Sequence, residues 1–185
     1  MRAASILAIL LASTAFGDDS EHQLKVSTQS GFPVVEKVTV YRTKNDKREV
    51  VGELTKLDKP LKLPSAGPFE VWVKPKDGAP VKAVEKLMVM DGQTHELKFG
   101  DVLGMVEVFG DNFPRAEKVV LTDTRDPGPG EKGHVAIQWA KDYRIEMCVP
   151  PGTYSVWVVP SNGAKAQRVE DNVRVQSGRT VRVVD

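Results

Sequence analysis

The sequence predicts an all-β fold made of two tandem β-sandwich domains behind an N-terminal signal peptide. Three observations predict it. Sequence blocks from the first half of the 185-residue chain recur in the same order in the second half, which indicates a duplicated unit. Short runs rich in Val, Thr and aromatic residues alternate with turn residues about every 8–12 positions, as in sandwiches and barrels. Beyond the first 17 residues, no stretch has the 3.6-residue apolar period of a helix.

The first 17 residues have the layout of a secretory signal peptide. Arg2 gives a charged start, residues 3–11 form an apolar run, and small residues follow up to Gly17. The apolar run is shorter than the roughly 20 residues that span a bilayer, and a retained anchor helix is the alternative. Cleavage after Gly17 or after Ala15 fits the spacing of the small residues. We therefore expect a secreted or periplasmic protein with no membrane span in the mature chain.

The repetition divides the mature chain into two domains, residues 18–100 and 101–185. The matching blocks are residues 32–38 with 113–119, 67–75 with 152–160, and 89–94 with 175–180. Their offset grows from 81 to 86 residues, so small insertions are expected in the second unit. The junction at 99–104 lacks the Gly/Ser or Pro composition of a flexible linker. We expect the two units to touch and to have a restricted relative orientation.

Period-two alternation assigns the faces of the predicted strands. The residues expected in the core are Phe69, Val71, Val73, Ile145, Met147, Val149, Tyr154, Val156 and Val158. The same alternation places Trp72 and Trp157 on outer faces and turns Trp139 toward the core. Gly67 and Gly152 precede central strands, where a tight turn is needed. These strands end at Pro75 and Pro160, because proline lacks the N–H that a ladder bond requires.

The second unit resembles the carboxypeptidase regulatory-like domain, a transthyretin-like (prealbumin-like) β-sandwich of about seven strands. The resemblance rests on residues 104–114, on 143–149 followed by the Pro-Pro-Gly-Thr-Tyr turn of 150–154, and on 173–181. The first unit matches more loosely, with residues 63–69 in place of that turn. One departure is Lys141-Asp142-Tyr143, which lacks the glycine that the family often has there. The resemblance implies a non-catalytic accessory or adhesive role outside the cytoplasm.

Composition and motifs argue against several classes of function. The chain carries 26 basic and 25 acidic residues, so it lacks the clustered basic charge expected for binding nucleic acid. The histidines His22, His95 and His134 are far apart in sequence, and no catalytic or zinc motif is present. We therefore expect no enzyme, no cofactor and no metal. The acidic loop at 123–131 lacks the regular spacing of a calcium loop and is interpreted as an exposed turn, with calcium as the alternative.

The lone cysteine excludes an intramolecular disulfide. Cys148 lies within a strand-like run, which favours a small apolar filler over a thiol that pairs with a second chain.

Trp72 and Trp157 are the candidate binding residues, because they occupy equivalent outward positions in the two units. Exposed indole rings bind partner proteins or stack on sugars. The alternative is that Lys or Arg stems, or the sister domain, cover both rings. The leading hypothesis is a structural or protein-interaction module. A carbohydrate-binding accessory protein, acting on an extracellular polymer through these tryptophans, is the second hypothesis.

Overall fold

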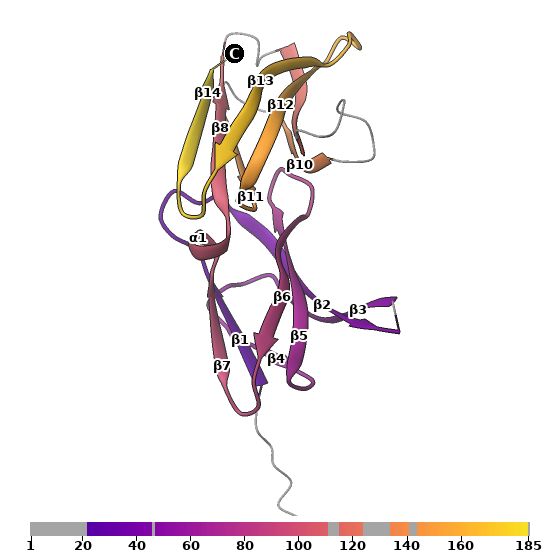
Figure 1. Ribbon diagram of the computed structural model, residues 1–185, viewed down its shortest axis with the longest axis vertical. Coiled ribbons are helices and arrows are strands. Elements are labelled where there is room, and N and C mark those ends of the chain that lie inside the picture. The colour runs from indigo at the N-terminus through magenta and orange to yellow at the C-terminus, as the bar shows by residue number, and fades with distance from the viewer. Residues whose placement is uncertain (1–21, 46, 111–114, 124–133, 141–143, 185) are drawn as a thin grey trace, which may run out of the picture.

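The computed structural model describes residues 22–45, 47–110, 115–123, 134–140 and 144–184, and these residues are nearly all in strands (Figure 1). The predicted signal peptide, residues 1–17, lies outside the described residues. So does the predicted exposed turn, apart from Asp123.

The strands of the first half form two sheets. They are β1 (His22–Ser27), β2 (Val35–Lys44), β3 (Lys47–Leu54), β4 (Leu61–Leu63), β5 (Gly67–Pro75), β6 (Val81–Val89) and β7 (Thr94–Lys98). One sheet has the order β4-β1-β7 and the other the order β3-β2-β5-β6. The pairing of β1 with β7 is parallel, and the other described pairs are antiparallel. The two sheets make a sandwich of seven strands.

The second half repeats this topology strand for strand. Its strands are β8 (Gly104–Phe109), β9 (Ala116–Asp123), β10 (His134–Trp139), β11 (Arg144–Val149), β12 (Gly152–Pro160), β13 (Gln167–Val175) and β14 (Thr180–Val184). The sheet orders are β11-β8-β14 and β10-β9-β12-β13, and the first and last strands are again parallel. The predicted all-β fold, with two tandem Ig-like or transthyretin-like β-sandwiches, is confirmed.

The inward faces follow the predicted alternation. The residues expected in the core of β5, β11 and β12 are all buried, and β5 and β12 end at the predicted prolines. Gly67 has φ +135° at the start of β5, a conformation that residues with a side chain rarely adopt. The Gly152 turn depends on small size instead, because a Cβ there would lie 2.7 Å from the Tyr154 hydroxyl. That hydroxyl donates to the Pro150 carbonyl at 2.7 Å. This hydrogen bond closes the turn, with the Tyr154 side chain beside Gly152.

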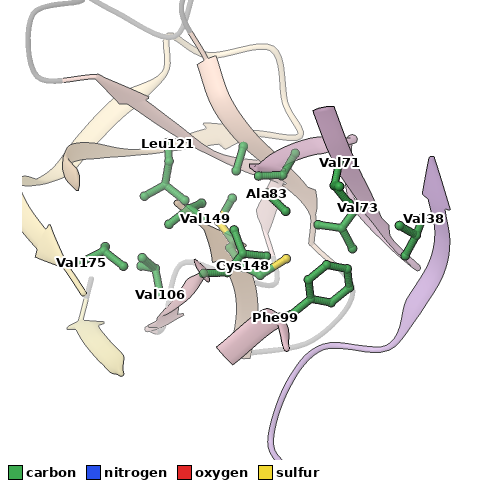
Figure 2. Packing of buried hydrophobic residues seen from close by; sticks show 14 of the residues in the cluster. Val38, Val71, Val73, Ala83, Phe99, Val106, Leu121, Cys148, Val149 and Val175 are labelled. Carbon is green, nitrogen blue, oxygen red and sulfur yellow. The ribbon is translucent and has the colours of Figure 1, made fainter. Parts of the chain in front are cut away.

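A single apolar core runs through both sandwiches and the short helix α1 (Phe99–Val102) between them (Figure 2). Phe99 and Leu103 are fully buried, and Phe99 stacks on Phe32 with ring centroids 5.9 Å apart. Cys148 is 1% exposed, although alternation sets it opposite the core face of β11. Its side chain points toward Phe99 (Figure 2), and β6 of the first sandwich contacts β11. The filler interpretation of Cys148 is confirmed.

Backbone hydrogen bonds also tie the sandwiches together. The turn between β5 and β6 contacts edge strand β10, with Gly78 and Gln138 forming an antiparallel bridge. The Ala79 N–H donates to the Ile137 carbonyl at 2.9 Å. These bonds and the shared core agree with the predicted contact and restricted orientation of the two units.

Candidate protein-interaction surface

Trp72 lies half-buried on the outer face of its sheet, opposite buried Val71 and Val73. Its Nε1–H donates to Glu70 Oε2 at 3.1 Å, and its ring meets Tyr41 edge-on with centroids 6.3 Å apart. The Arg48 and Lys82 side chains also lie near the ring. We call Tyr41, Arg48, Glu70, Trp72 and Lys82 the Trp72 cluster.

The two cations of the Trp72 cluster cover its indole. The Arg48 guanidinium lies 5.0 Å from the ring centroid and the Lys82 ammonium 5.8 Å from it. Both distances are in the range of cation–π attraction. Arg48 is held there by Glu70, whose Oε2 lies 3.1 Å from its Nη2. Glu70 therefore orients both the indole and the arginine that covers it.

Trp157 has a similar arrangement, in which Arg168 occupies the position of Lys82 and the hydrogen-bond partner of the indole differs. It too is half-buried on an outer face, and its Nε1–H donates to buried Thr122 at 3.0 Å. The Arg168 guanidinium lies 5.7 Å from its ring centroid and pairs with Asp171 at 3.3 Å. In each sandwich, a carboxylate thus holds an arginine over an outward tryptophan.

This covering disfavours sugar stacking on either ring. A sugar needs the open face of an indole, whereas each ring already has a cation within 6 Å. A protein partner can instead contact the tryptophan edge together with its arginine. Lys and Arg side chains thus lie over Trp72 and Trp157, as expected if both rings are covered.

Trp139 corrects the sequence-based assignment of β10. It was expected in the core, but it is 46% exposed, and Ala136 on the opposite face is the buried residue. The reason is that β10 is an edge strand that faces the first sandwich. The face of β10 that carries Trp139 therefore lies at the junction between the sandwiches and not in the core. A register shift between His134 and Ala136 further disturbs the alternation of this strand.

Two hollows flank the junction. One, of about 450 Å³, lies between Trp139, exposed Val34, Pro75 and Arg144. The other, of about 440 Å³, joins Trp72 and Lys82 of the first sandwich to Val135 and Pro150 of the second. The Trp72 cluster therefore borders a groove whose walls come from both sandwiches. Alternation along single strands gives no signal for a groove of this kind.

The histidines do not form one site. His22 and His95 lie on the adjacent strands β1 and β7, while His134 lies on β10 of the other sandwich. The His22 Nε2 is 3.7 Å from Asp91, and its buried Nδ1 has no hydrogen-bond partner. Among the described residues, no group of three His, Cys, Asp or Glu side chains is placed to hold a metal ion.

Among the described residues of the second sandwich, one carboxylate is buried. Glu107 on β8 is only 4% exposed, and it accepts a hydrogen bond from Arg182 Nε at 2.9 Å. Arg144 pairs with the same carboxylate and also with Glu146 at 2.7 Å. Since both arginines neutralise the buried charge, this cluster has a structural role and offers no free acid.

Searches against known proteins give only weak likeness. No family model and no curated protein matches the chain. Among solved structures, it is similar to the TIE protein of Bacillus anthracis (15% identity, 90% of this chain and 34% of that one, TM-score 0.31). It is also similar to GBS52, the minor pilin of Streptococcus agalactiae (14%, 89% and 94%, TM-score 0.30). A third neighbour is the D295N mutant of the shaft pilin SpaA of Lactobacillus rhamnosus GG (7%, 89% and 97%, TM-score 0.26).

These neighbours carry no functional information for this chain, because TM-scores near 0.3 do not establish a shared fold. The chain also spans only about a third of the length of the TIE protein. Within the described residues, no helix is long and apolar enough to cross a bilayer.

Proposed function

We propose that this protein is an exported, non-catalytic module that binds a protein partner or serves as a structural unit. Residues 1–17 would direct export, and residues 18–100 and 101–185 would be the two domains. Each domain would belong to the carboxypeptidase regulatory-like class. The Pro-Pro-Gly-Thr-Tyr turn supports this assignment, since the hydrogen bond from Tyr154 to Pro150 gives that sequence a structural purpose.

The Trp72 cluster is the observation that carries the proposal. Trp, Tyr and Arg are the residue types that contribute most to binding energy at protein interfaces. Here Glu70 fixes both Trp72 and Arg48 in advance, so little side-chain entropy would be lost on binding. The adjacent groove gives a partner concave surface from both sandwiches. Trp157 with Arg168 would provide a second contact on the other domain.

A site-specific crosslink tests the proposal. A photoreactive phenylalanine analogue is placed at Lys82, inside the cluster, or at Lys86, four residues along the same strand and exposed. We expect a protein adduct in the native envelope from position 82 only, and Arg48→Ala should weaken it several-fold. Equal adducts from both positions would contradict the proposal. Glycan binding that disappears in Trp72→Ala would favour the carbohydrate hypothesis instead.

A further inference from the structure

Trp139 differs from the other two tryptophans because its indole is uncovered. Cations lie 5.0 and 5.8 Å from the ring centroid of Trp72 and 5.7 Å from that of Trp157. Within the part of the chain that the structure describes, no cation and no second aromatic ring lies over Trp139. The residue is 46% exposed, so its indole offers a large apolar surface to a ligand.

The backbone that carries Trp139 is held on both sides. Trp139 pairs with Lys118 of β9, and its N–H donates to the Asp77 carbonyl of the first sandwich at 3.1 Å. Two residues earlier, the Ile137 carbonyl accepts the Ala79 N–H at 2.9 Å. This end of β10 is therefore fixed between the two sandwiches, and a side chain on such a segment is positioned before a ligand arrives.

Two hollows share Trp139 as a lining residue. The smaller, of about 350 Å³, lies between Trp139, Lys74 and the turn at residues 76–80. We call the larger one, of about 450 Å³, the Trp139 hollow. Its volume falls within the range of about 300–1,000 Å³ for small-ligand sites, which occur preferentially between domains.

The Trp139 hollow combines apolar walls with charges that balance. Its apolar lining residues, besides the indole, are Pro33, Val34 and Pro75. Its charged lining residues are two bases and two acids, namely Lys76, Arg144, Asp77 and Glu146. Arg144 and Glu146 lie 2.7 Å apart, and Gln138 adds an amide that both donates and accepts. Because the charges balance, the lining favours neither an anion nor a cation.

A ligand for this hollow needs one apolar face and an edge that both donates and accepts hydrogen bonds. A purely apolar ligand would desolvate the charged side chains without giving them partners. A proline-rich segment lacks the backbone N–H groups that the two acids would need. A sugar ring presents C–H groups on its face and hydroxyls at its edge, and each hydroxyl both donates and accepts.

We propose that the Trp139 hollow binds a neutral saccharide, with one sugar ring stacked on the Trp139 indole. The hydroxyls of that ring would contact the charged side chains and Gln138. The site is separate from the Trp72 cluster, so this inference goes beyond the proposed function and does not rest on it.

Indole N–H signals in an NMR titration test the proposal, because the chain has three tryptophans and two of them serve as internal controls. Trp→Phe substitutions assign the signals, and the probes are maltohexaose, cellohexaose and chitohexaose. We expect at least one probe to shift the Trp139 signal saturably and to leave those of Trp72 and Trp157 in place. Trp139→Ala should weaken this binding by about tenfold or more, whereas the matched control Trp157→Ala should bind like the wild type.

Three results would overturn the saccharide site. The first is that no probe shifts the Trp139 signal. The second is that a probe binds equally well to Trp139→Ala protein, and the third is that decaproline shifts the Trp139 signal where no saccharide does. Each of these leaves the proposed protein partner intact if position 82 still forms an adduct. Conversely, saccharide binding at Trp139 without any adduct at position 82 would retain this site and remove the Trp72 cluster as a partner site.

Discussion

The Lys25 ammonium lies 3.2 Å from the Glu96 carboxylate across the parallel pairing of β1 and β7. The second sandwich has an ion pair at the equivalent place with the charges reversed, since Glu107 on β8 faces Arg182 on β14. The two pairs differ in burial. Both members of the first are more than half exposed, whereas Glu107 is 4% exposed.

This difference predicts unequal costs of removing each cation. Arg182→Met should lower the free energy of unfolding by about 1–3 kcal/mol, because it takes a hydrogen bond from a buried carboxylate. Lys25→Met should cost less than about 0.5 kcal/mol, as expected for an exposed pair. Urea denaturation of both variants measures this. Equal losses would show that the burial of Glu107 does not matter.

The hydrogen bond from the Ser155 hydroxyl makes the contribution of Asp171 to folding stability depend on pH. It donates to Asp171 at 2.5 Å, and this bond, more than the backbone N–H of Asn172 and the charge of Arg168, holds the pKa of Asp171 below its usual range. A lowered folded-state pKa stabilises the fold above the ordinary pKa of 3.8, and this contribution is lost as the pH falls through the folded value. Ser155→Ala should therefore raise the pKa of Asp171 in an NMR titration. It should lower the melting temperature at pH 7 more than at pH 2.

The Tyr154 turn predicts a non-additive pair of substitutions. Tyr154→Phe should cost about 1 kcal/mol through loss of the bond to Pro150. Gly152→Ala should cost more, because its Cβ would lie 2.7 Å from the Tyr154 hydroxyl. Combining the two should cost less than their sum, since removing the hydroxyl relieves the closest contact. Strict additivity in a double-mutant cycle would contradict this geometry.

Burial of Cys148 predicts an inert thiol. Desolvation raises the pKa of Cys148 to about 12, so almost no thiolate is present at neutral pH. We expect the folded protein to resist a thiol reagent and to react with one equivalent only after denaturation. Fast reaction of the native protein would show that the two sandwiches separate in solution, because the first sandwich covers this residue.

The junction turn predicts that Gly78→Val frees the relative orientation of the sandwiches. Its side chain would collide with Gln138 and with the Ile137 carbonyl, which breaks the backbone contact. Residual dipolar couplings should fit one alignment tensor for the wild-type protein and two for Gly78→Val. The control is Gly163→Asn in the equivalent turn, where φ is +75° and no neighbour lies close. It should behave like the wild type.

Strand alternation predicted the faces of β5 and β12 correctly, because polar or aromatic residues separate their buried residues. It failed at Trp139, where the larger apolar face covers a neighbouring domain, and a single sequence does not distinguish that surface from a core. The sequence-based interpretation included the covering of Trp72 and Trp157 by Lys or Arg side chains, but it did not name the residues. Arg168 faces Trp157 across β12 and β13 as Lys82 faces Trp72 across β5 and β6, so repetition relates these two cations but does not point to Arg48 on β3.

The reversed ion pairs also bear on how a duplicated chain avoids exchanging its own strands. Docking of β7 onto β8 would set Glu96 against Glu107, and docking of β14 onto β1 would set Arg182 against Lys25. Like charges directly opposite each other are destabilising, so each of these wrong pairings would be disfavoured. The two halves have the same topology, yet the reversed charges of the two ion pairs favour the pairing of β7 with β1 and of β14 with β8 during folding.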